Sequence, residues 1–310
     1  KVHGVLSNRY FVSQRLQAAI SSFGPDLVLY IPWTSLTART MIRAGTLARY
    51  ARHAPIGVLA LQPRANELVT RLVGRIHRPD LVLACGPGAQ RQAEELRIPA
   101  ARIPLGVDTG KFRPATSREI ATLRDRAGIP REAFLVLHVG HLKESRNLAV
   151  LERLGRIPGV TCMLVTSTST EVQRPVAARL EAAGVKLLPE YQQEVELAYR
   201  LADAYVFPVM APHDAIELPL SVLEAAACNL TIVSTRYGGL PDLMRGAGRD
   251  DGVIWVNTGR EAVEAMEGLS RRGGGPSPRT RDLVASYTWE TVAAEVLSQA
   301  ARLVGQGPGR

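Results

Sequence analysis

The chain has few cysteines, few aromatic residues and no long apolar run, and each shortage excludes a class of protein. Its 310 residues include three cysteines, Cys85, Cys162 and Cys228, which lie far apart in apolar stretches. We therefore expect no zinc site or other metal site, and three buried thiols in a reducing compartment. No run of about 20 apolar residues is present, so no segment is expected to span a bilayer.

Acidic residues are scarce in the first third of the chain. Residues 1–114 contain 16 Lys and Arg against 6 Asp and Glu, whereas the remainder contains 22 against 23. A basic surface attracts nucleic acid, anionic membranes or phosphorylated substrates. Aromatic residues make up only 5% of the chain, and none interleave with these arginines as a stacking platform for nucleic acid requires. We expect a membrane surface with a lipid-linked acceptor rather than nucleic acid; the alternative is a general preference for arginine over lysine.

The chain begins with Lys-Val-His-Gly, without an initiator methionine and without the apolar segment of a signal peptide. This start indicates a fragment or a processed product. The composition is 46% hydrophobic and 22% charged, which is typical of a soluble globular protein with room for two separate cores. We expect a cytoplasmic protein, peripheral at most on the inner face of the membrane.

Short apolar runs alternate with helical stretches along the chain. The runs expected as strands are 26–31, 55–61, 80–85, 134–140, 160–166, 185–188, 204–209, 230–234 and 252–256. Several are apolar throughout, so both of their faces should be buried, as in parallel sheets covered by helices. The stretch 106–117 predicts a linker, and a ligand is expected between two α/β units at the carboxyl ends of the strands.

The most informative motif runs from Glu217 to Pro241 and indicates an acidic loop, a helix, a short strand and a Gly-Gly turn. Pro219 suits the first turn of the helix. Glu224 follows among small apolar residues, either as a solvated surface group or as an acceptor for the hydroxyls of a bound sugar or ribose. The helix N-terminus offers N–H groups and the positive end of a dipole to a phosphate.

A second motif joins the buried strand expected at 134–140 to a basic loop and a helix. Gly140 ends the strand, and His141 and Arg146 follow in the loop. A glycine lets the backbone approach a phosphate, and an arginine can bind it through two N–H groups. His141 is only partly charged near neutral pH. This order of elements predicts a phosphate-binding loop.

Together these motifs resemble the donor site of retaining GT-B glycosyltransferases of family 4. That family has a glutamate, seven intervening residues and a second glutamate, followed by Glu-Ala-x-Ala, a strand and a Gly-Gly-x-Pro turn. The matching positions here are Glu224, Ala225, Ala227, Gly238, Gly239 and Pro241. Glu217 stands one residue closer to Glu224 than the family spacing, and Gly140, His141 and Arg146 occupy the family's Gly-Arg and Lys places.

The resemblance implies an α/β fold with two Rossmann-like doubly wound parallel-sheet domains, the GT-B fold, with the first domain incomplete. Residues 1–114 would form the acceptor-side domain and 115–286 the nucleotide-sugar donor domain. Residues 287–304 would form a C-terminal helix that packs back on the first domain, followed by a tail at 305–310.

The resemblance also implies a function: transfer of a sugar from a nucleotide-diphosphate sugar, with retention of configuration and without a metal or other cofactor. Glu217 would orient the sugar and Arg146 would stabilise the leaving diphosphate, as the catalytic residues. The implied donor-binding residues are Gly140, His141, Asn147, Leu188, Tyr191, Leu220, Ser221, Val222 and Glu224. The acceptor would be a glycan, a lipid-linked molecule or a small molecule.

Two other functions remain open at this stage. A non-catalytic protein that binds a nucleotide sugar or a partner on the same fold is favoured by the short glutamate spacing, by His141 and by the incomplete first domain. A basic nucleic-acid-associated module would bind any polynucleotide with a steep salt dependence.

Overall fold

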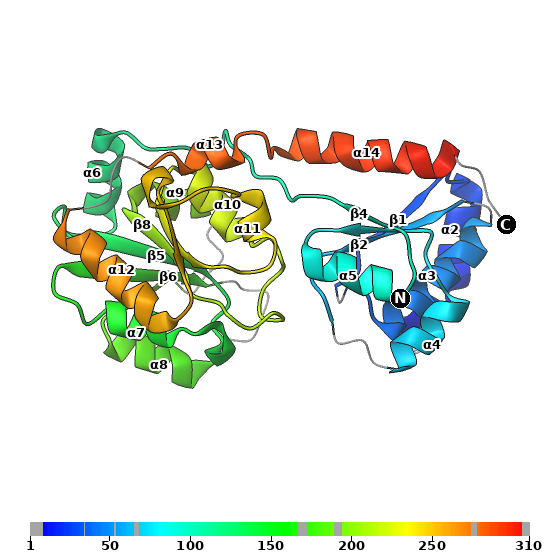
Figure 1. Ribbon diagram of the computed structural model, residues 1–310, viewed down its shortest axis with the longest axis horizontal. Coiled ribbons are helices and arrows are strands. Elements are labelled where there is room, and N and C mark those ends of the chain that lie inside the picture. The colour runs from blue at the N-terminus through cyan, green and yellow to red at the C-terminus, as the bar shows by residue number, and fades with distance from the viewer. Residues whose placement is uncertain are drawn as a thin grey trace. The chain divides into compact units, whose positions relative to one another are not determined.

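The computed structural model describes residues 9–33, 35–52, 54–64, 68–166, 173–188, 194–273 and 278–305. The chain divides into two compact units, whose elements are labelled in Figure 1. The first unit comprises Lys1–Pro104, Ala215–Leu218 and Glu290–Arg310, and the second comprises Leu105–Asp214 and Pro219–Trp289. A short segment from the middle of the chain and the C-terminal helix therefore belong with the first unit.

The first unit has a four-stranded parallel sheet in the order β1-β2-β3-β4, with helices along it. Its elements are α2 (Gln14–Phe23), β1 (Val28–Tyr30), α3 (Ala38–Ala51), β2 (Ile56–Ala60), α4 (Leu68–Ile76), β3 (Leu81–Ala84), α5 (Pro87–Glu95), β4 (Ala100–Arg102) and the final helix α14 (Trp289–Gly305). Local sequence sets the helix ends: Ser13 and Thr37 accept hydrogen bonds from backbone amides as N-caps of α2 and α3.

The core of this unit lies on both faces of its sheet. One cluster contains Met41 and Leu47 of α3 against Ile56 and Val58 of β2. A smaller cluster joins Val292 of α14 to Leu83 and Ile103, so the last helix of the chain packs on the first sheet. Burial of both sheet faces explains the continuous apolar runs of the strands.

The second unit has a six-stranded parallel sheet in the order β10-β9-β8-β5-β6-β7. Its elements are α6 (Ser117–Arg126), β5 (Phe134–Gly140), η1 (Glu144–Arg146), α7 (Ala149–Leu154), β6 (Val160–Thr166), α8 (Arg174–Ala182), β7 (Lys186–Leu188), α9 (Val195–Leu201), β8 (Ala204–Phe207), α10 (Leu220–Ala227), β9 (Thr231–Thr235), α11 (Leu240–Leu243), η2 (Arg249–Asp251), β10 (Val253–Val256), α12 (Gly259–Arg271) and α13 (Thr280–Val284). Helix α7 packs with α8 and α12, whereas α10 packs with α9 and α13 (Figure 1).

Every strand expected from the sequence is present, and β5 and β6 occupy the expected residues 134–140 and 160–166. Strand β4 was not expected, because Ala-Ala-Arg contains no apolar run. The expected α/β fold with two parallel sheets is thus confirmed, and the first sheet is the smaller of the two. The three cysteines are buried and unpaired, as expected.

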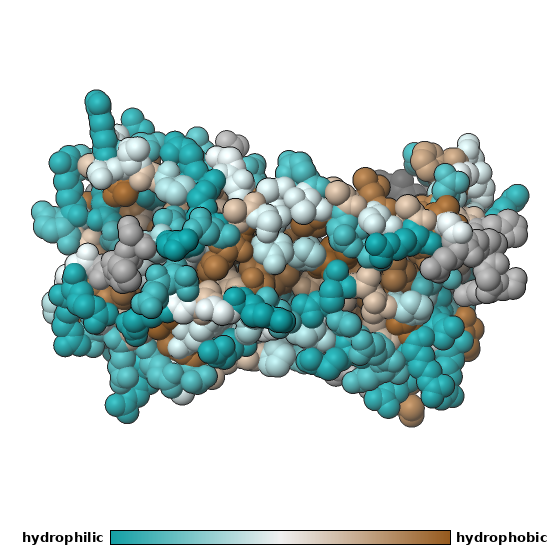
Figure 2. Space-filling model, turned by 45° about the horizontal axis from the view of Figure 1, so that its top comes forward, coloured by the Kyte–Doolittle hydropathy of each residue, from teal (hydrophilic) through white to brown (hydrophobic). Residues whose placement is uncertain are grey.

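The surface of the described residues carries few large apolar side chains. The face in Figure 2 is covered mainly by hydrophilic residues, with hydrophobic side chains in smaller groups between them. Within the part of the chain that the structure describes, no helix is long and apolar enough to cross a bilayer. One helix of the first unit, α4, nevertheless turns several large apolar side chains to solvent.

Candidate functional site

The second sheet reverses its strand order at β5, and the sequence motifs meet at this point. Strands β6 and β7 follow β5 on one side, whereas β8, β9 and β10 lie on the other. Open α/β sheets bind ligands outside the carboxyl ends of the strands at such a reversal. Gly140 ends β5 there, Arg146 follows in η1, and α10 begins after β8. The expected phosphate loop and the expected helix N-terminus therefore lie at the same edge of one sheet.

Arg146 is a buried cation at this edge. Its side chain is 7% exposed, and its Nη2 donates to the backbone oxygen of Asp214 at 2.6 Å. Its Nε has no hydrogen-bond partner among the described residues. Burial lowers the pKa of Arg146, because the charge is removed from water without a hydrogen-bonded carboxylate among the described residues. A buried charge in this condition is favourable for binding an anion.

Gly140 provides the space that Arg146 occupies. A Cβ atom at Gly140 would lie 2.5 Å from Nη1 of Arg146 and 3.1 Å from Nε2 of His138. Any larger residue would therefore push the guanidinium away. The sequence predicted a glycine here for close backbone approach, and the structure assigns that approach to the arginine as well.

His138 points its second ring nitrogen toward the same space, and sequence reasoning assigned it no role. The ring is fully buried, and Nδ1 lies 2.8 Å from the backbone oxygen of Val206. A carbonyl only accepts, so Nδ1 carries the hydrogen and Nε2 presents a lone pair. Nε2 has no partner among the described residues. Burial lowers the pKa of His138 to about 4, so the ring is neutral at physiological pH. The available signal was a lone ionisable residue inside a buried strand.

The N-terminus of α10 opens toward this edge. The amides of Val222 and Leu223 both donate to the oxygen of Pro219, at 3.0 and 3.5 Å. Among the described residues, the amides of Leu220 and Ser221 have no backbone acceptor. These are the unpaired donors of a helix start, and they lie at the positive end of the helix dipole.

The side chains at the start of α10 differ in exposure. The Ser221 hydroxyl is hydrogen-bonded to that of Tyr205, a fully buried residue of β8. The Val222 side chain is fully buried, so a ligand could meet only its backbone. Leu220 and Ser221 are half-buried. The expected binding role of this turn thus falls on its amides and on one hydroxyl.

Glu224 holds a carboxylate in α10 with one oxygen anchored. Its Oε2 accepts a hydrogen bond from the hydroxyl of Tyr199 at 2.6 Å, and Tyr199 is fully buried. Its Oε1 has no hydrogen bond to any described residue. Burial raises the pKa of Glu224, while the Tyr199 hydroxyl and the charge of Lys111 act in the opposite direction. The anchored carboxylate can accept a hydrogen from a ligand hydroxyl through Oε1.

Two other predicted donor residues shape the loop between β5 and α7. Asn147 has a left-handed backbone, φ 60°, and its Nδ2 donates to the oxygen of Pro208 at 3.1 Å, which ties the loop to the end of β8. His141 is half-buried, and burial together with the charges of Arg146 and Lys143 lowers its pKa. His141 is therefore a weaker cation than the arginine of the family pattern.

The predicted base-binding residues are only partly described. Leu188 ends β7, is half-buried, and its backbone oxygen accepts from the Thr166 hydroxyl at 3.3 Å. Tyr191 lies outside the described residues. The carboxyl ends of β6 and β7 are thus joined next to β5, on the far side of the sheet order from β8.

Glu217 occupies a different place from the one expected for a sugar-orienting residue. It belongs to the first unit, where its Oε1 accepts from the amide of Gly88 and its Oε2 from the amide of Ala89, both at 2.7 Å. It is 4% exposed, and its own amide donates to the oxygen of Leu61 at 2.9 Å. Both carboxylate oxygens therefore cap the N-terminus of α5. The sequence could not reveal this, because Gly88 lies 129 residues away.

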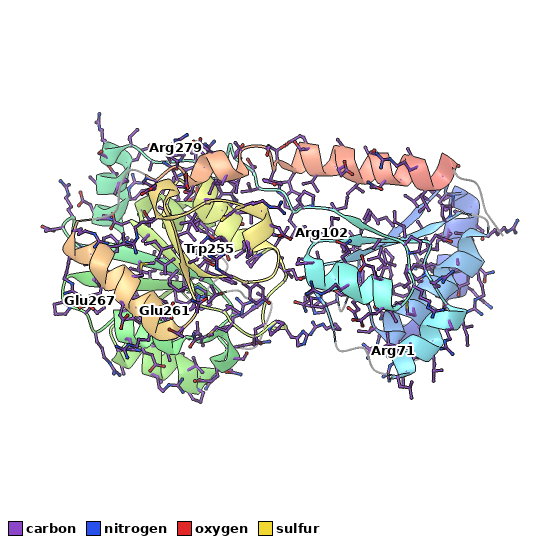
Figure 3. The ribbon with its side chains drawn as sticks, viewed as in Figure 1. Arg71, Arg102, Trp255, Glu261, Glu267 and Arg279 are labelled. Carbon is purple, nitrogen blue, oxygen red and sulfur yellow. The ribbon has the colours of Figure 1, made fainter. Side chains whose placement is uncertain are left out.

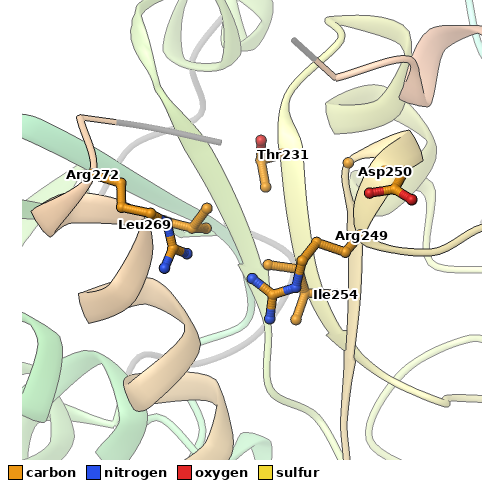
Figure 4. A pocket seen from close by; sticks show the side chains of 7 residues that line it. Thr231, Arg249, Asp250, Ile254, Leu269 and Arg272 are labelled. Atoms are coloured by element: carbon orange, nitrogen blue, oxygen red, sulfur yellow. The ribbon is translucent and has the colours of Figure 1, made fainter. Parts of the chain in front are cut away.

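A cavity of about 230 Å³ lies elsewhere in the second unit (Figure 4). It is lined by Thr231, Arg249, Asp250, Gly252, Ile254, Leu269 and Arg272. Thr231 is the first residue of β9, so this cavity is at the amino ends of the strands and not at the candidate site. Among the described residues, no group of three or more His, Cys, Asp or Glu side chains could hold a metal ion.

The comparisons with known proteins agree with the position of this site. Residues 133–271, which contain β5, the basic loop, α10 and the Gly-Gly turn, match the family described as "Glycosyl transferases group 1". The chain is 27% identical over 211 residues to the D-inositol 3-phosphate glycosyltransferase of Mycobacteroides abscessus, covering 64% of this chain and 45% of that protein. It is 31% identical over 160 residues to the enzyme of the same name from Acidothermus cellulolyticus, covering 46% and 34%. The matched regions thus span less than half the length of these relatives.

A likeness to solved structures extends over both units. The structure of Anabaena HepE in complex with UDP-glucose has a TM-score of 0.73 to this chain, with 16% sequence identity, and covers 93% of this chain and 82% of that one. At this identity the likeness concerns the fold alone. The protein is therefore an α/β protein of the GT-B fold class, and residues 133–271 carry the match to group 1 glycosyl transferases.

Proposed function

We propose that the second unit binds a nucleotide-diphosphate sugar and that the protein transfers the sugar to an acceptor with retention of configuration. The observation that carries this proposal is Arg146, a buried cation at the strand-order reversal, beside the open N-terminus of α10. The matched glycosyl transferase region and the UDP-glucose complex of HepE support it. The donor would be a UDP or GDP sugar.

In this proposal the diphosphate is held by charge and by amide donors. Arg146 would bind it from one side, and the amides of Leu220 and Ser221 from the other. Gly140 would keep the guanidinium in place. Stabilising the charge that develops on the leaving diphosphate is usually the largest catalytic contribution. The arginine and the helix dipole would supply it without a metal ion, so we propose metal-independent transfer.

The sugar-nucleoside part would be oriented by Glu224. Its anchored carboxylate would accept a hydrogen bond from a ribose hydroxyl through Oε1, with Tyr199 holding the other oxygen. The incoming acceptor hydroxyl would attack the face that the leaving phosphate departs from, with the phosphate accepting its proton. No carboxylate nucleophile is then needed, and the two-carboxylate arrangement of glycoside hydrolases does not apply.

The role of Glu217 in this proposal is positioning. Both of its oxygens are bonded to amides of α5, so it fixes the segment that precedes α10 in the chain. The alternative of a non-catalytic nucleotide-sugar binder is favoured by the same observation, because no second free carboxylate is then supplied by the Glu217–Glu224 motif. The acceptor would be a glycan, a lipid-linked molecule or a small molecule, met at the cytoplasmic face of a membrane.

Calorimetric titration with UDP, GDP and ADP tests the donor site. We expect saturable binding of one nucleotide, weakened at least tenfold in Glu224→Ala and in Arg146→Gln, since each removes a charged hydrogen bond of roughly 1.5–3 kcal/mol. Arg272→Gln, in the cavity at the opposite end of the strands, is the matched control and should bind as the unchanged protein does. Failure of the folded protein to bind any of the three nucleotides would overturn the proposal.

A second measurement separates transfer from binding alone. Loss of the anomeric proton signal of the bound nucleotide's sugar donor, followed by NMR, reports sugar release or transfer. The non-catalytic alternative predicts unchanged donor over many hours at saturating concentration. Product with the donor's anomeric configuration would support the retaining reaction, whereas inverted product would exclude it.

A further inference from the structure

Helix α4 of the first unit presents its large apolar side chains to solvent. Leu68, Val69, Leu72 and Ile76 are 71%, 56%, 49% and 77% exposed. The buried residues of the helix are instead Thr70 and Gly74. A surface helix of a globular protein normally turns its apolar stripe toward the core. This helix does the reverse, and its apolar stripe is not used in folding the described part of the unit.

The small residues explain how α4 is held without those side chains. Helix α4 packs on α3. Gly74 brings the backbone close to Leu96, since a Cβ there would lie 3.8 Å from Leu96 Cδ2. Val73, half-buried, is the apolar residue of α4 that packs against the core cluster of this unit. The inner face of α4 is therefore complete, and the exposed leucine and isoleucine side chains add nothing to it.

Arginines lie among the exposed apolar residues, and acidic residues are absent. Residues 68–78 read Leu-Val-Thr-Arg-Leu-Val-Gly-Arg-Ile-His-Arg, with three arginines and no Asp or Glu. Arg71 and Arg75 are exposed, and Figure 3 shows Arg71 extending outward from α4. Arg78 is held near the helix end, where its Nη1 donates to the oxygen of Arg97 at 3.0 Å.

Exposed apolar side chains interleaved with arginines are typical of helices that lie in a membrane interface. The apolar residues enter the boundary between headgroups and acyl chains, and the arginines contact anionic headgroups. A second copy of this chain is a poor occupant, since a two-fold contact through α4 would bring Arg71 and Arg75 of both copies together. An acidic protein groove would match the charge but offers no reason for four exposed apolar side chains on so short a helix.

We propose that α4 with Arg78 forms an interfacial segment that docks the first unit on an anionic lipid surface. The apolar residues supply insertion, and the arginines supply the preference for negative headgroups. This surface is separate from the donor site, so the proposal does not depend on nucleotide binding. It gives a physical basis to the basic first third of the sequence.

Co-sedimentation of the full chain with lipid vesicles tests the proposal. Vesicles of phosphatidylglycerol and phosphatidylcholine are compared with vesicles of phosphatidylcholine alone. We expect binding to the anionic vesicles that weakens as salt increases, because headgroup attraction is screened within a Debye length. Equal binding to both vesicle types, or no sedimentation with either, would overturn the proposal.

Paired variants separate the two contributions. Leu72→Ser with Ile76→Ser should lower affinity for anionic vesicles at least tenfold, and Arg71→Gln with Arg75→Gln should do so by roughly fivefold per arginine. The control is Leu297→Ser with Arg302→Gln on the exposed face of α14, which should bind as the unchanged protein does.

Two readouts protect the conclusion. All substitutions are on exposed positions, so melting temperatures should stay together, which excludes unfolding as the cause of lost binding. Gel filtration at increasing protein concentration tests the second copy. If the unchanged chain dimerises and the Leu72→Ser, Ile76→Ser variant is monomeric, α4 is a dimer contact and the membrane proposal fails. Retained vesicle binding in both α4 variants would also overturn it.

Discussion

Two glutamates of one sequence motif meet opposite conditions in this protein. Glu217 lies in the first unit, where both carboxylate oxygens accept backbone hydrogen bonds of 2.7 Å from α5. Glu224 lies in the second unit, where one oxygen accepts from Tyr199 and the other has no hydrogen bond to any described residue. Both carboxylates are largely buried, so the difference is one of completeness rather than of exposure.

The same contrast extends to the two units as wholes. Four buried side-chain nitrogen or oxygen atoms lack a hydrogen bond among the described residues, and all four are in the second unit. Two of these, on His138 and Arg146, face the space at Gly140; the others are on Glu196 and Arg200 of α9. Unpaired buried polar atoms cost stability, so they are expected where a ligand completes them. Completed groups such as Glu217 mark architecture instead.

Replacement of Glu217 should give the largest loss of stability. Glu217→Ala leaves the amides of Gly88 and Ala89 buried without an acceptor, at roughly 1–3 kcal/mol each, so we expect a loss of about 3–5 kcal/mol. Urea unfolding measures the loss, and hydrogen exchange should show lost protection at the start of α5. Nucleotide affinity of the folded variant should be unchanged.

The matched variants for this prediction are Glu217→Gln and Glu224→Ala. The amide keeps one acceptor oxygen, so Glu217→Gln should lose about half as much stability. Glu224→Ala removes a partly desolvated carboxylate and should change stability little while weakening nucleotide binding. If Glu217→Ala is as stable as the unchanged protein and instead abolishes sugar transfer, Glu217 acts in the chemistry and the comparison of the two glutamates fails.

His138 should make the second unit sensitive to acid. The pKa in the folded state is lowered to about 4 from an ordinary 6.5, so between these values the unfolded chain takes up a proton that the folded ring refuses. Stability is therefore complete above pH 6.5 and falls as the pH is lowered toward 4, by about 3 kcal/mol in total. His138→Asn keeps a donor for the Val206 oxygen and removes the titration.

The measurement is the difference in unfolding free energy between the two proteins across pH 4 to 7. Taking the difference cancels the contributions of other titrating groups, including Glu224, whose raised pKa acts with the opposite sign. A difference that does not change with pH would mean that Nε2 of His138 has a proton acceptor or water that the space at Gly140 holds in solution.

The sequence predicted the parts of this protein that depend on neighbours along the chain. Strands such as β5 are visible because burial on both faces requires an apolar run, whereas β4 is an edge strand of Ala-Ala-Arg and carries no such signal. Gly140, Arg146 and Glu224 were found together because loop, helix and strand follow in a fixed order. The partners of Glu217 and the unpaired nitrogen of His138 were missed, because they depend on tertiary contacts.

The same substitution at two glycines should have opposite effects in the two units. A Cβ at Gly86 would lie 2.4 Å from Cβ of Glu217, whose side chain is fixed by α5, so Gly86→Ala should cost about 1–3 kcal/mol of stability. A Cβ at Gly140 would meet only the movable end of Arg146, so Gly140→Ala should change stability little and weaken nucleotide binding severalfold. Thermal unfolding and calorimetry distinguish the two; equal stability losses would contradict the contrast.

Removal of the Tyr199 hydroxyl should give the smallest effect and the most specific one. The pKa of Glu224 is raised by burial, and the Tyr199 hydroxyl holds it lower than burial alone would. Tyr199→Phe therefore raises this pKa further. The ionised carboxylate accepts a ligand hydroxyl more strongly than the neutral acid, by about 1 kcal/mol, or roughly fivefold in affinity. Nucleotide affinity should fall as the pH is lowered through the pKa of Glu224, and in Tyr199→Phe this fall should begin at higher pH. Glu224→Gln cannot ionise and should bind weakly at every pH. If Tyr199→Phe and the unchanged protein lose affinity at the same pH, the Tyr199 bond does not set the charge of Glu224, and the anchored oxygen is as purely architectural as those of Glu217.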